Sequence, residues 1–413
     1  MPKHRTASSG YQNCGEDDAN RGPGVSSLGP RSGWSLCPST SFAPCYAASW
    51  SSLSCAGVDE LEDLGIVVLL GRCPRTRNGT VSPTMALLDR LGLQHPVVQA
   101  GMGGGTSGAE LAGAVSAAGG LGTVGIMVDP QEMHDQIVRA RTLAPGRPMA
   151  VNLLMPFVRK SHVQACVDAG ADCVVLFCGF DAGLVGHLHT AGVLVLQQVG
   201  TRAQAVRALH DGADGLIAQG IEAGGHLLGV ESALEFLPKA LDVAGDRPVL
   251  LAGGIAEAGD VRRALDAGAA AAVAGTRFLL TEECAAHPAY KQRVLGATDT
   301  IETLLFSVAW HERHRVVPNA ATERWCRSSQ LGPGPVRALN RVAAPLLRRL
   351  PSSLSAGALR MQRRSLPFYG PASILRGMDE RLVEITPLYA GETAGRIGSI
   401  VPAAQAVHEL AGA

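Results

Sequence analysis

The sequence predicts an α/β protein built on a (β/α)8 TIM barrel, with a C-terminal, mostly helical extension and a disordered N-terminal segment. From Pro96 onward, short apolar runs alternate with helix-length stretches, which is typical of a parallel sheet covered on both faces. Eight such repeats follow at roughly 22-residue spacing, which favours a barrel over an open sheet. Glycines and polar residues gather where the apolar runs end, and a TIM barrel carries its chemistry at that end of its strands.

The eight candidate strands are apolar runs of strand length, at 96–101, 121–126, 148–155, 173–179, 193–199, 215–220, 249–254 and 270–278. Helical patterns lie between them, for example at 107–118, 131–143, 160–169, 201–210 and 259–267. Three of the helices are followed by Gly170, Gly212 or Gly268. A glycine there supplies the left-handed residue that ends a helix before the next strand begins.

Three regions are expected. Residues 1–84 are rich in Ser, Gly, Pro and Cys with little apolar periodicity, so we expect disorder there, or a start codon assigned too early with the true start near Met85. Residues 85–285 form the barrel. Residues 286–413 form a helical region that packs on the barrel and closes with a helix at 401–410.

The C-terminal region contains an arginine-rich stretch. Nine arginines and no acidic residue lie between Arg327 and Arg376. A solvated helical face explains this composition most simply, and a lid that faces an anion is the functional alternative.

The composition argues against several classes of protein. Acidic and basic residues number 36 each, so the whole chain has no footprint for nucleic acid or a membrane surface. No apolar run is long enough to span a membrane, and no signal peptide is evident. The ten cysteines form no C-x-x-C pair, which indicates a reducing, cytoplasmic setting and no zinc site. His311, Glu312 and His314 lack zinc-site spacing and are interpreted as a surface cluster.

The chemistry is expected around residues 220–226, which follow the sixth strand. Gly224 and Gly225 let the backbone approach a flat ligand, and His226 can move a proton near neutral pH. The alternative, a tight turn with an incidental histidine, is disfavoured because Gln219 also stands at a strand end and Asn152 is a polar residue inside the third apolar run.

An anion site is expected after the last two strands. Gly253, Gly254, Gly275 and Thr276 offer backbone N–H groups there, and in this fold these loops frequently bind phosphate. A flat ligand with a phosphate, such as flavin mononucleotide (FMN), fits that description. A dinucleotide fingerprint at 103–108 is a competing pattern, but it leaves the later glycines unexplained.

Several motifs together resemble the nitronate monooxygenase (2-nitropropane dioxygenase) family. The resemblance covers about 90–410 and rests on 96–105, 110–122, 151–153, 219–226, 252–256, 275–279 and 387–392. It implies a TIM barrel that holds FMN without a covalent bond. By match to the family's motifs, the flavin contacts are Ala100, Gly101, Met102, Asn152, Gln219, Gly224, Gly254, Gly275 and Thr276.

The resemblance also implies an activity. His226 aligns with the family's catalytic histidine, which takes the α-proton of a nitroalkane or lies beside a bound nitronate. The expected function is oxidation of alkyl nitronates with dioxygen, with a small molecule as the substrate. The same motifs occur in FMN-dependent enoyl-(acyl-carrier-protein) reductases, which use NAD(P)H. In that alternative the stretch from Arg337 to Arg364 receives an acidic carrier protein. A flavin-binding protein without turnover is the third alternative.

Overall fold

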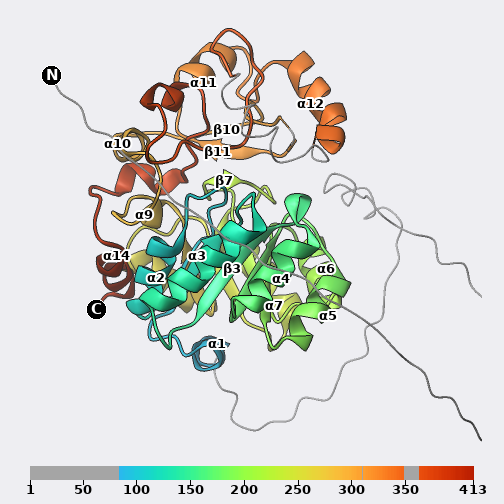
Figure 1. The fold of residues 1–413 in the computed structure, drawn as a ribbon, viewed down its shortest axis with the longest axis vertical. Helices are drawn as coiled ribbons and strands as arrows, with labels where there is room; N and C mark the ends of the chain where they lie inside the picture. The colour runs from blue at the N-terminus through green and yellow to red at the C-terminus, as the bar shows by residue number, and fades with distance from the viewer. Residues whose placement is uncertain (1–82, 309, 348–361) are drawn as a thin grey trace, which may run out of the picture. The chain divides into compact units, whose positions relative to one another are not determined.

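The centre of the molecule is a closed barrel of eight parallel strands (Figure 1). The computed structural model describes residues 83–308, 310–347 and 362–413. The barrel strands are β1 (Val97–Gln99), β2 (Gly122–Gly125), β3 (Met149–Leu154), β4 (Cys173–Phe177), β5 (Leu194–Val199), β6 (Gly215–Gln219), β8 (Val249–Ala252) and β9 (Ala271–Ala274).

The strand order is β1-β9-β8-β6-β5-β4-β3-β2. A single bridge between Val98 and Leu121 then joins the two ends of this sheet. All eight predicted strands are present in a parallel barrel, so the predicted fold class is confirmed. The predicted segment 1–84 lies outside the described residues as far as residue 82, so its disorder and a start near Met85 stay predictions, as do the domain boundaries.

Helices surround the barrel, as Figure 1 shows for α2 to α7. The helices of this part of the chain are α1 (Pro83–Leu91), α2 (Ala109–Ala117), α3 (Pro130–Leu143), α4 (Lys160–Asp168), α5 (Ala182–Thr190), α6 (Arg202–His210), α7 (Ala233–Ala244) and α8 (Ala258–Asp266). Gly170, Gly212 and Gly268 have φ of +72°, +101° and +99°. The left-handed residues that the sequence predicts after α4, α6 and α8 are therefore confirmed.

Helix α1 covers the end of the barrel where the strands begin. Its Leu87 and Leu91 pack in one cluster with interior residues such as Val175, Ile217 and Leu250. Arg90 of α1 contacts Asp214, just before β6. Because this end is filled by apolar side chains, the opposite end of the strands is the one left for chemistry.

The last barrel strand is shorter than predicted. The expected strand at 270–278 ends at Ala274, and helix α9 (Thr276–Leu279) follows. The prediction was wrong beyond Ala274 because Arg277 is buried and its guanidinium donates to the carbonyl oxygens of Leu280 and Ser399. The chain must turn to make those contacts, and an apolar run alone does not reveal the turn.

The C-terminal extension is helical but also contains a sheet that the sequence did not predict. Strands β10 (Ile301–Thr303), β11 (His314–Val316) and β7 (Gly225–His226) pair in that order, antiparallel throughout. The remaining elements are α10 (Pro288–Leu295), α11 (Ala320–Trp325), α12 (Gly334–Leu347), the 3-10 turns η3 (Met155–Phe157), η4 (Glu380–Glu384) and η5 (Glu392–Arg396), and α14 (Ala403–Ala411). Helix α14 buries Ala406 and Val407 against the barrel side, which confirms the predicted closing helix.

Gly122 provides a test of the packing between β2 and α2. A Cβ atom at Gly122 would lie 1.9 Å from the carbonyl oxygen of Ala112 in α2. We expect Gly122→Ala to lower the free energy of unfolding by about 1–3 kcal/mol, as for other overpacked cores. Gly186→Ala is the control, because Gly186 lies in α5 with open space around it, and alanine should stabilise the helix by about 0.5–1 kcal/mol. Urea unfolding measures both, and equal effects would contradict the packing argument.

Candidate active site

His226 lies at the end of the barrel opposite α1, directly beyond β6. The chain leaves β6 at Gln219, turns through 220–224 and forms β7, where His226 pairs with His314 of β11. The Gln219 amide spans this turn, since its Nε2 donates to the His226 carbonyl (2.9 Å) and its Oε1 accepts from the Leu228 N–H (3.0 Å). The sequence predicts a flavin contact for Gln219, and in the structure both ends of its amide hold the strand that carries His226.

The imidazole of His226 lies in an aromatic cluster. It stacks on the indole of Trp310 with ring centroids 3.6 Å apart and planes inclined by 16°. His314 and Tyr389 approach it with centroids at 5.2 Å and 5.3 Å. The cluster combines residues of three distant chain segments around one imidazole, of which only His226 was predicted.

The electrostatics of the cluster keep both histidines neutral. Burial lowers the pKa of His226 well below its usual 6.5, and the neighbouring His314 lowers it further. Burial lowers the pKa of His314 to about 4, against the effect of a hydrogen bond between its Nδ1 and the Glu312 carbonyl oxygen (3.0 Å). The Nε2 atoms of both rings are buried without a hydrogen-bond partner in the described part of the chain. An unprotonated imidazole nitrogen that nothing else occupies can accept a proton.

The surface cluster predicted from His311, Glu312 and His314 is wrong for His314, which is fully buried. Pairing of β11 with β7 turns this side chain inward, beside His226. The three residues of β11, His-Arg-Val, give no local signal of this pairing, and the region was expected to be helical. Trp310 is the second residue that the sequence analysis missed.

Gly224 and Gly225 have different structural roles. A Cβ atom at Gly224 would lie 2.5 Å from the Ala390 carbonyl carbon and the Gly391 nitrogen. The Thr276 hydroxyl accepts a hydrogen bond from the Gly391 N–H (2.9 Å). Thr276 and Gly224 therefore hold the C-terminal segment around Gly391 against the barrel end. Gly225 has φ of +78° with open space around it, so its role here is the left-handed turn into β7.

The predicted residues of β1, β3 and β9 come together. A Cβ atom at Gly101 would overlap the Cβ of Asn152, and one at Gly275 would contact the Cβ of Ala100 at 3.7 Å. Asn152 is buried and donates to the Val175 carbonyl oxygen (3.3 Å). Met102 follows on the same loop, where its N–H donates to the Ser107 hydroxyl (2.9 Å).

The loops after β8 and β9 contain backbone N–H groups that no other group occupies. Within the described residues, the amides of Gly254, Gly275 and Thr276 make no hydrogen bond. Gly253 and Gly254 have φ of +112° and +75°, and Gly254 has open space where a Cβ would stand. These amides are a suitable cradle for an anion.

The turn that leads into α8 does not share in this cradle. Asp260 accepts from the N–H groups of Ala256 (2.8 Å) and Glu257 (3.1 Å), and Arg396 binds the same carboxylate (2.8 Å). These hydrogen bonds outweigh burial and lower the pKa of Asp260. The amides of the two residues just before α8 are thus occupied by the protein's own carboxylate.

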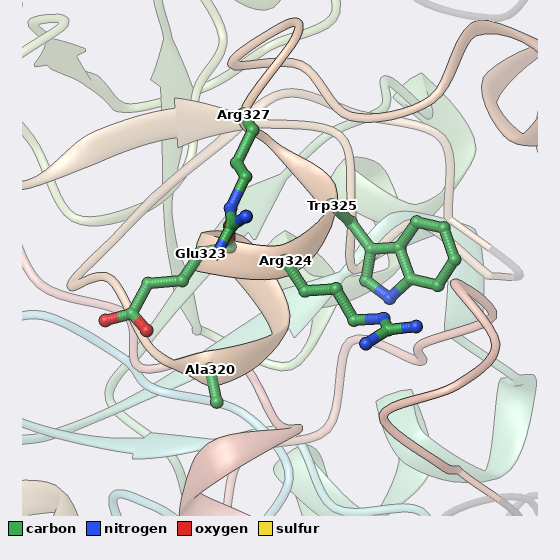
Figure 2. A pocket seen from close by; sticks show the side chains of 5 residues that line it. All are labelled: Ala320, Glu323, Arg324, Trp325 and Arg327. Carbon is green, nitrogen blue, oxygen red and sulfur yellow. The ribbon is translucent and has the colours of Figure 1, made fainter.

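A hollow lies on the C-terminal extension. Figure 2 shows the hollow, of about 390 Å³, lined by Ala320, Glu323, Arg324, Trp325 and Arg327. The Arg324 guanidinium lies 5.3 Å from the centre of the Trp325 ring, and the Trp325 Nε1 donates to the Arg364 carbonyl oxygen (3.1 Å). In the described part of the chain, Arg324 and Arg327 form no ion pair. Arg348, Arg349 and Arg360 of the arginine-rich stretch lie outside the described residues.

Residues 83–308, 310–347 and 362–413 contain no candidate metal site and no candidate membrane-spanning helix. No three His, Cys, Asp or Glu side chains there are placed to hold a metal ion. No helix in these ranges has the length and apolar character that crossing a membrane requires.

Comparison with known proteins shows the family of the chain. The model of the nitronate monooxygenase family matches residues 84–161 and 155–412. The chain belongs to the nitronate monooxygenase family. The resemblance inferred from the motifs at 96–105 and 219–226 is thereby confirmed.

The names of similar proteins describe oxidoreductases. One is a (3aS,4S,5R,7aS)-5-hydroxy-7a-methyl-1-oxo-octahydro-1H-indene-4-carboxyl-CoA dehydrogenase of Rhodococcus jostii, 35% identical over 219 residues, which are 52% of this chain. The chain spans 61% of that relative's length.

Two solved structures share the fold. The nitroalkane oxidase of Streptomyces ansochromogenes has a TM-score of 0.62 and 26% identity, over 79% of this chain and 97% of its own. FabK of Thermotoga maritima has a TM-score of 0.61 and 26% identity, over 79% and 94%.

Substitution of Gln219 tests whether this side chain has a structural role or contacts the flavin. Gln219→Leu removes two hydrogen bonds and leaves the His226 and Leu228 backbone groups unpaired. We expect it to lower the free energy of unfolding, without added FMN, by about 1–3 kcal/mol. Gln198→Leu is the control, because the Gln198 side chain makes no hydrogen bond among the described residues. If Gln219→Leu matched the control in urea unfolding but weakened FMN binding, the flavin contact would be favoured instead.

Proposed function

We propose that this member of the nitronate monooxygenase family is an FMN-dependent oxidoreductase that oxidises alkyl nitronates with dioxygen, and that His226 is its general base. The observation that carries the proposal is the neutral imidazole of His226 at the strand-end face of the barrel, whose Nε2 has no hydrogen-bond partner among the described residues. His162 and His314 also have a buried Nε2 without a partner in the described part of the chain, and His226 differs from them in its place directly beyond β6, at the strand-end face.

The residues present fit FMN. The free amides of Gly254, Gly275 and Thr276 suit its phosphate, and Ala100, Gly101, Met102 and Asn152 border the same face. We assign the flavin contacts to these residues, with Gly253 supplying the turn. When bound, FMN supplies the acceptor for the two electrons of the substrate. We also propose a reducing, cytoplasmic location, because the cysteines within the described residues form no disulfide.

Residues of the chain itself accept the substrate's α-proton and hold the base in place. The Nε2 of His226 accepts the α-proton of a nitroalkane, and the electron pair of that C–H bond stays with the substrate. Gln219 fixes the backbone of His226 through the turn, so the ring keeps its place while the proton moves. The aromatic faces of Trp310 and Phe177 exclude water from this side of the site.

A second function is favoured by two observations. The chain is 35% identical to a relative whose name describes the dehydrogenation of a CoA thioester. In addition, Arg324 and Arg327 line a hollow without carboxylate partners (Figure 2), and arginines of this kind bind phosphate or an acidic carrier protein. An FMN-dependent thioester oxidoreductase that uses NAD(P)H, such as an enoyl-(acyl-carrier-protein) reductase, is therefore the alternative.

Anaerobic stopped-flow mixing of the FMN-loaded protein separates the two functions. The proposal expects fast bleaching of the flavin absorbance by an alkyl nitronate and recovery of the absorbance on adding dioxygen. Fast bleaching by NAD(P)H, with none by the nitronate, would replace it with the thioester alternative. A protein that stays colourless after incubation with FMN would contradict both.

His226→Asn tests the general base. Asparagine keeps a polar side chain of similar size but cannot accept the proton at neutral pH, so we expect kcat/KM for a nitroalkane to fall by roughly two or more decades. FMN binding should be unchanged. His210→Asn is the control, since His210 is exposed on α6. Unchanged turnover in His226→Asn would reduce His226 to a structural residue and favour a flavin-binding protein without turnover.

The lowered pKa of His226 predicts how kcat/KM for a nitroalkane depends on pH. Burial lowers the pKa of His226 below 6.5, and only the neutral ring accepts a proton. We therefore expect kcat/KM for a nitroalkane to be flat from about pH 6.5 upward and to fall as the pH drops through the lowered pKa. A base with its ordinary pKa would instead lose activity near pH 6.5, which a pH–rate profile would show.

A further inference from the structure

His226 is stacked on an indole instead of being held by a carboxylate. Its ring lies on Trp310 with centroids 3.6 Å apart and planes at 16°. Within the described residues, no Asp or Glu side chain bonds to the His226 ring, and the titratable neighbour that acts on it is His314. A histidine base commonly relies on a carboxylate to orient the ring and to stabilise the imidazolium that forms. At His226 another group is needed to orient the ring and to stabilise the imidazolium.

We propose that Trp310 is the positioning residue that replaces this carboxylate, holding the imidazole in its plane and stabilising the imidazolium against the face of the indole. The inference rests on the proposed role of His226 as the base. In the step concerned, a proton passes from the substrate carbon to the Nε2 of His226, and the C–H electron pair remains on the substrate.

The physical basis is the attraction between a cation and the face of an aromatic ring. Trp is the strongest partner for a cation among the aromatic residues, and the attraction grows when the pair is removed from water. The neutral imidazole gains no such attraction. The stabilisation therefore acts on the protonated ring and on the transition state that leads to it, which is the requirement for accelerating the step.

The surroundings hold Trp310 in this orientation. The ring is 4% exposed, and Phe157 and Phe177 meet it edge to face at interplanar angles of 83° and 82°, with centroids 5.4 Å and 6.1 Å away. Two edge contacts of this kind limit rotation of the indole. The stack with His226 is therefore part of a packed arrangement to which four chain segments contribute.

The other titratable groups around His226 do not supply the same stabilisation. Burial lowers the pKa of His314 to about 4 and raises the pKa of the Tyr389 hydroxyl, so both are uncharged near neutral pH. Protonated His314 would repel an imidazolium at His226. Gln219, on the barrel side, uses its amide on backbone groups alone.

The test compares Trp310→Phe and Trp310→Leu with the wild-type protein, all loaded with FMN. Nitrogen-15 NMR of labelled histidines follows the protonation of His226 directly. We expect the pKa of His226 to fall by about one in Trp310→Leu, and by less in Trp310→Phe. The kcat/KM for a nitroalkane should fall about 3- to 10-fold in Trp310→Leu, with most of the loss in kcat. Phe157→Leu is the control, because it loosens the packing around Trp310 without removing the indole face.

The outcomes separate the positioning role from the proposed function. An unchanged His226 pKa in both Trp310 variants, or a fall equal to that in Phe157→Leu, would overturn the positioning role. A His226 pKa that follows the series from Trp to Phe to Leu supports it, even if nitroalkane turnover is absent and the proposed function fails. Should Trp310→Leu not fold, Trp310→Phe decides the matter, because a Phe side chain retains an aromatic face with a weaker attraction for cations.

Discussion

The candidate site depends on the antiparallel pairing of β7 with β11. Strand β7 is two residues long, and without a partner His226 would lie in a glycine-rich turn that does not fix its direction. Pairing places His226 opposite His314 and brings the segment with Trp310 over the imidazole. Since neighbouring residues of a strand face opposite sides, a slip of one residue would turn His226 away from this cluster. The two hydrogen bonds of Gln219 fix the same register from the barrel side.

The glycines at the strand ends serve two different purposes. Gly101 and Gly224 allow close packing, on Asn152 and on the backbone at Ala390 and Gly391 respectively. Gly254 and Gly275 leave amides without a partner and so remain available to a ligand. A glycine-rich end of a barrel is therefore not a uniform ligand surface, because part of it is needed to seat the C-terminal extension.

The barrel could be predicted from the sequence because its signals are local. Apolar runs of strand length, and glycines such as Gly170 at helix ends, depend on their immediate neighbours alone. The places of His226, Gly254 and Gly275 at the strand-end face could be predicted because these residues follow their strands directly. The places of Trp310 and His314 could not be predicted, since they depend on a strand pairing that spans almost 90 positions in the sequence. The end of β9 was missed for a related reason, as the Arg277 contact with Ser399 is also non-local.

The joint that closes the barrel has a consequence for how tightly a ligand is held. Strands β1 and β2 are joined by one bridge, from Val98 to Leu121, whereas β1 and β9 share three paired residues. The loop with Met102 leaves β1 at this joint, and a Cβ at Gly125 of β2 would lie 2.1 Å from the Met102 carbonyl oxygen. The loop and β2 are thus packed backbone against backbone at this joint. A molecule bound by the loop would stabilise the closed barrel by mass action.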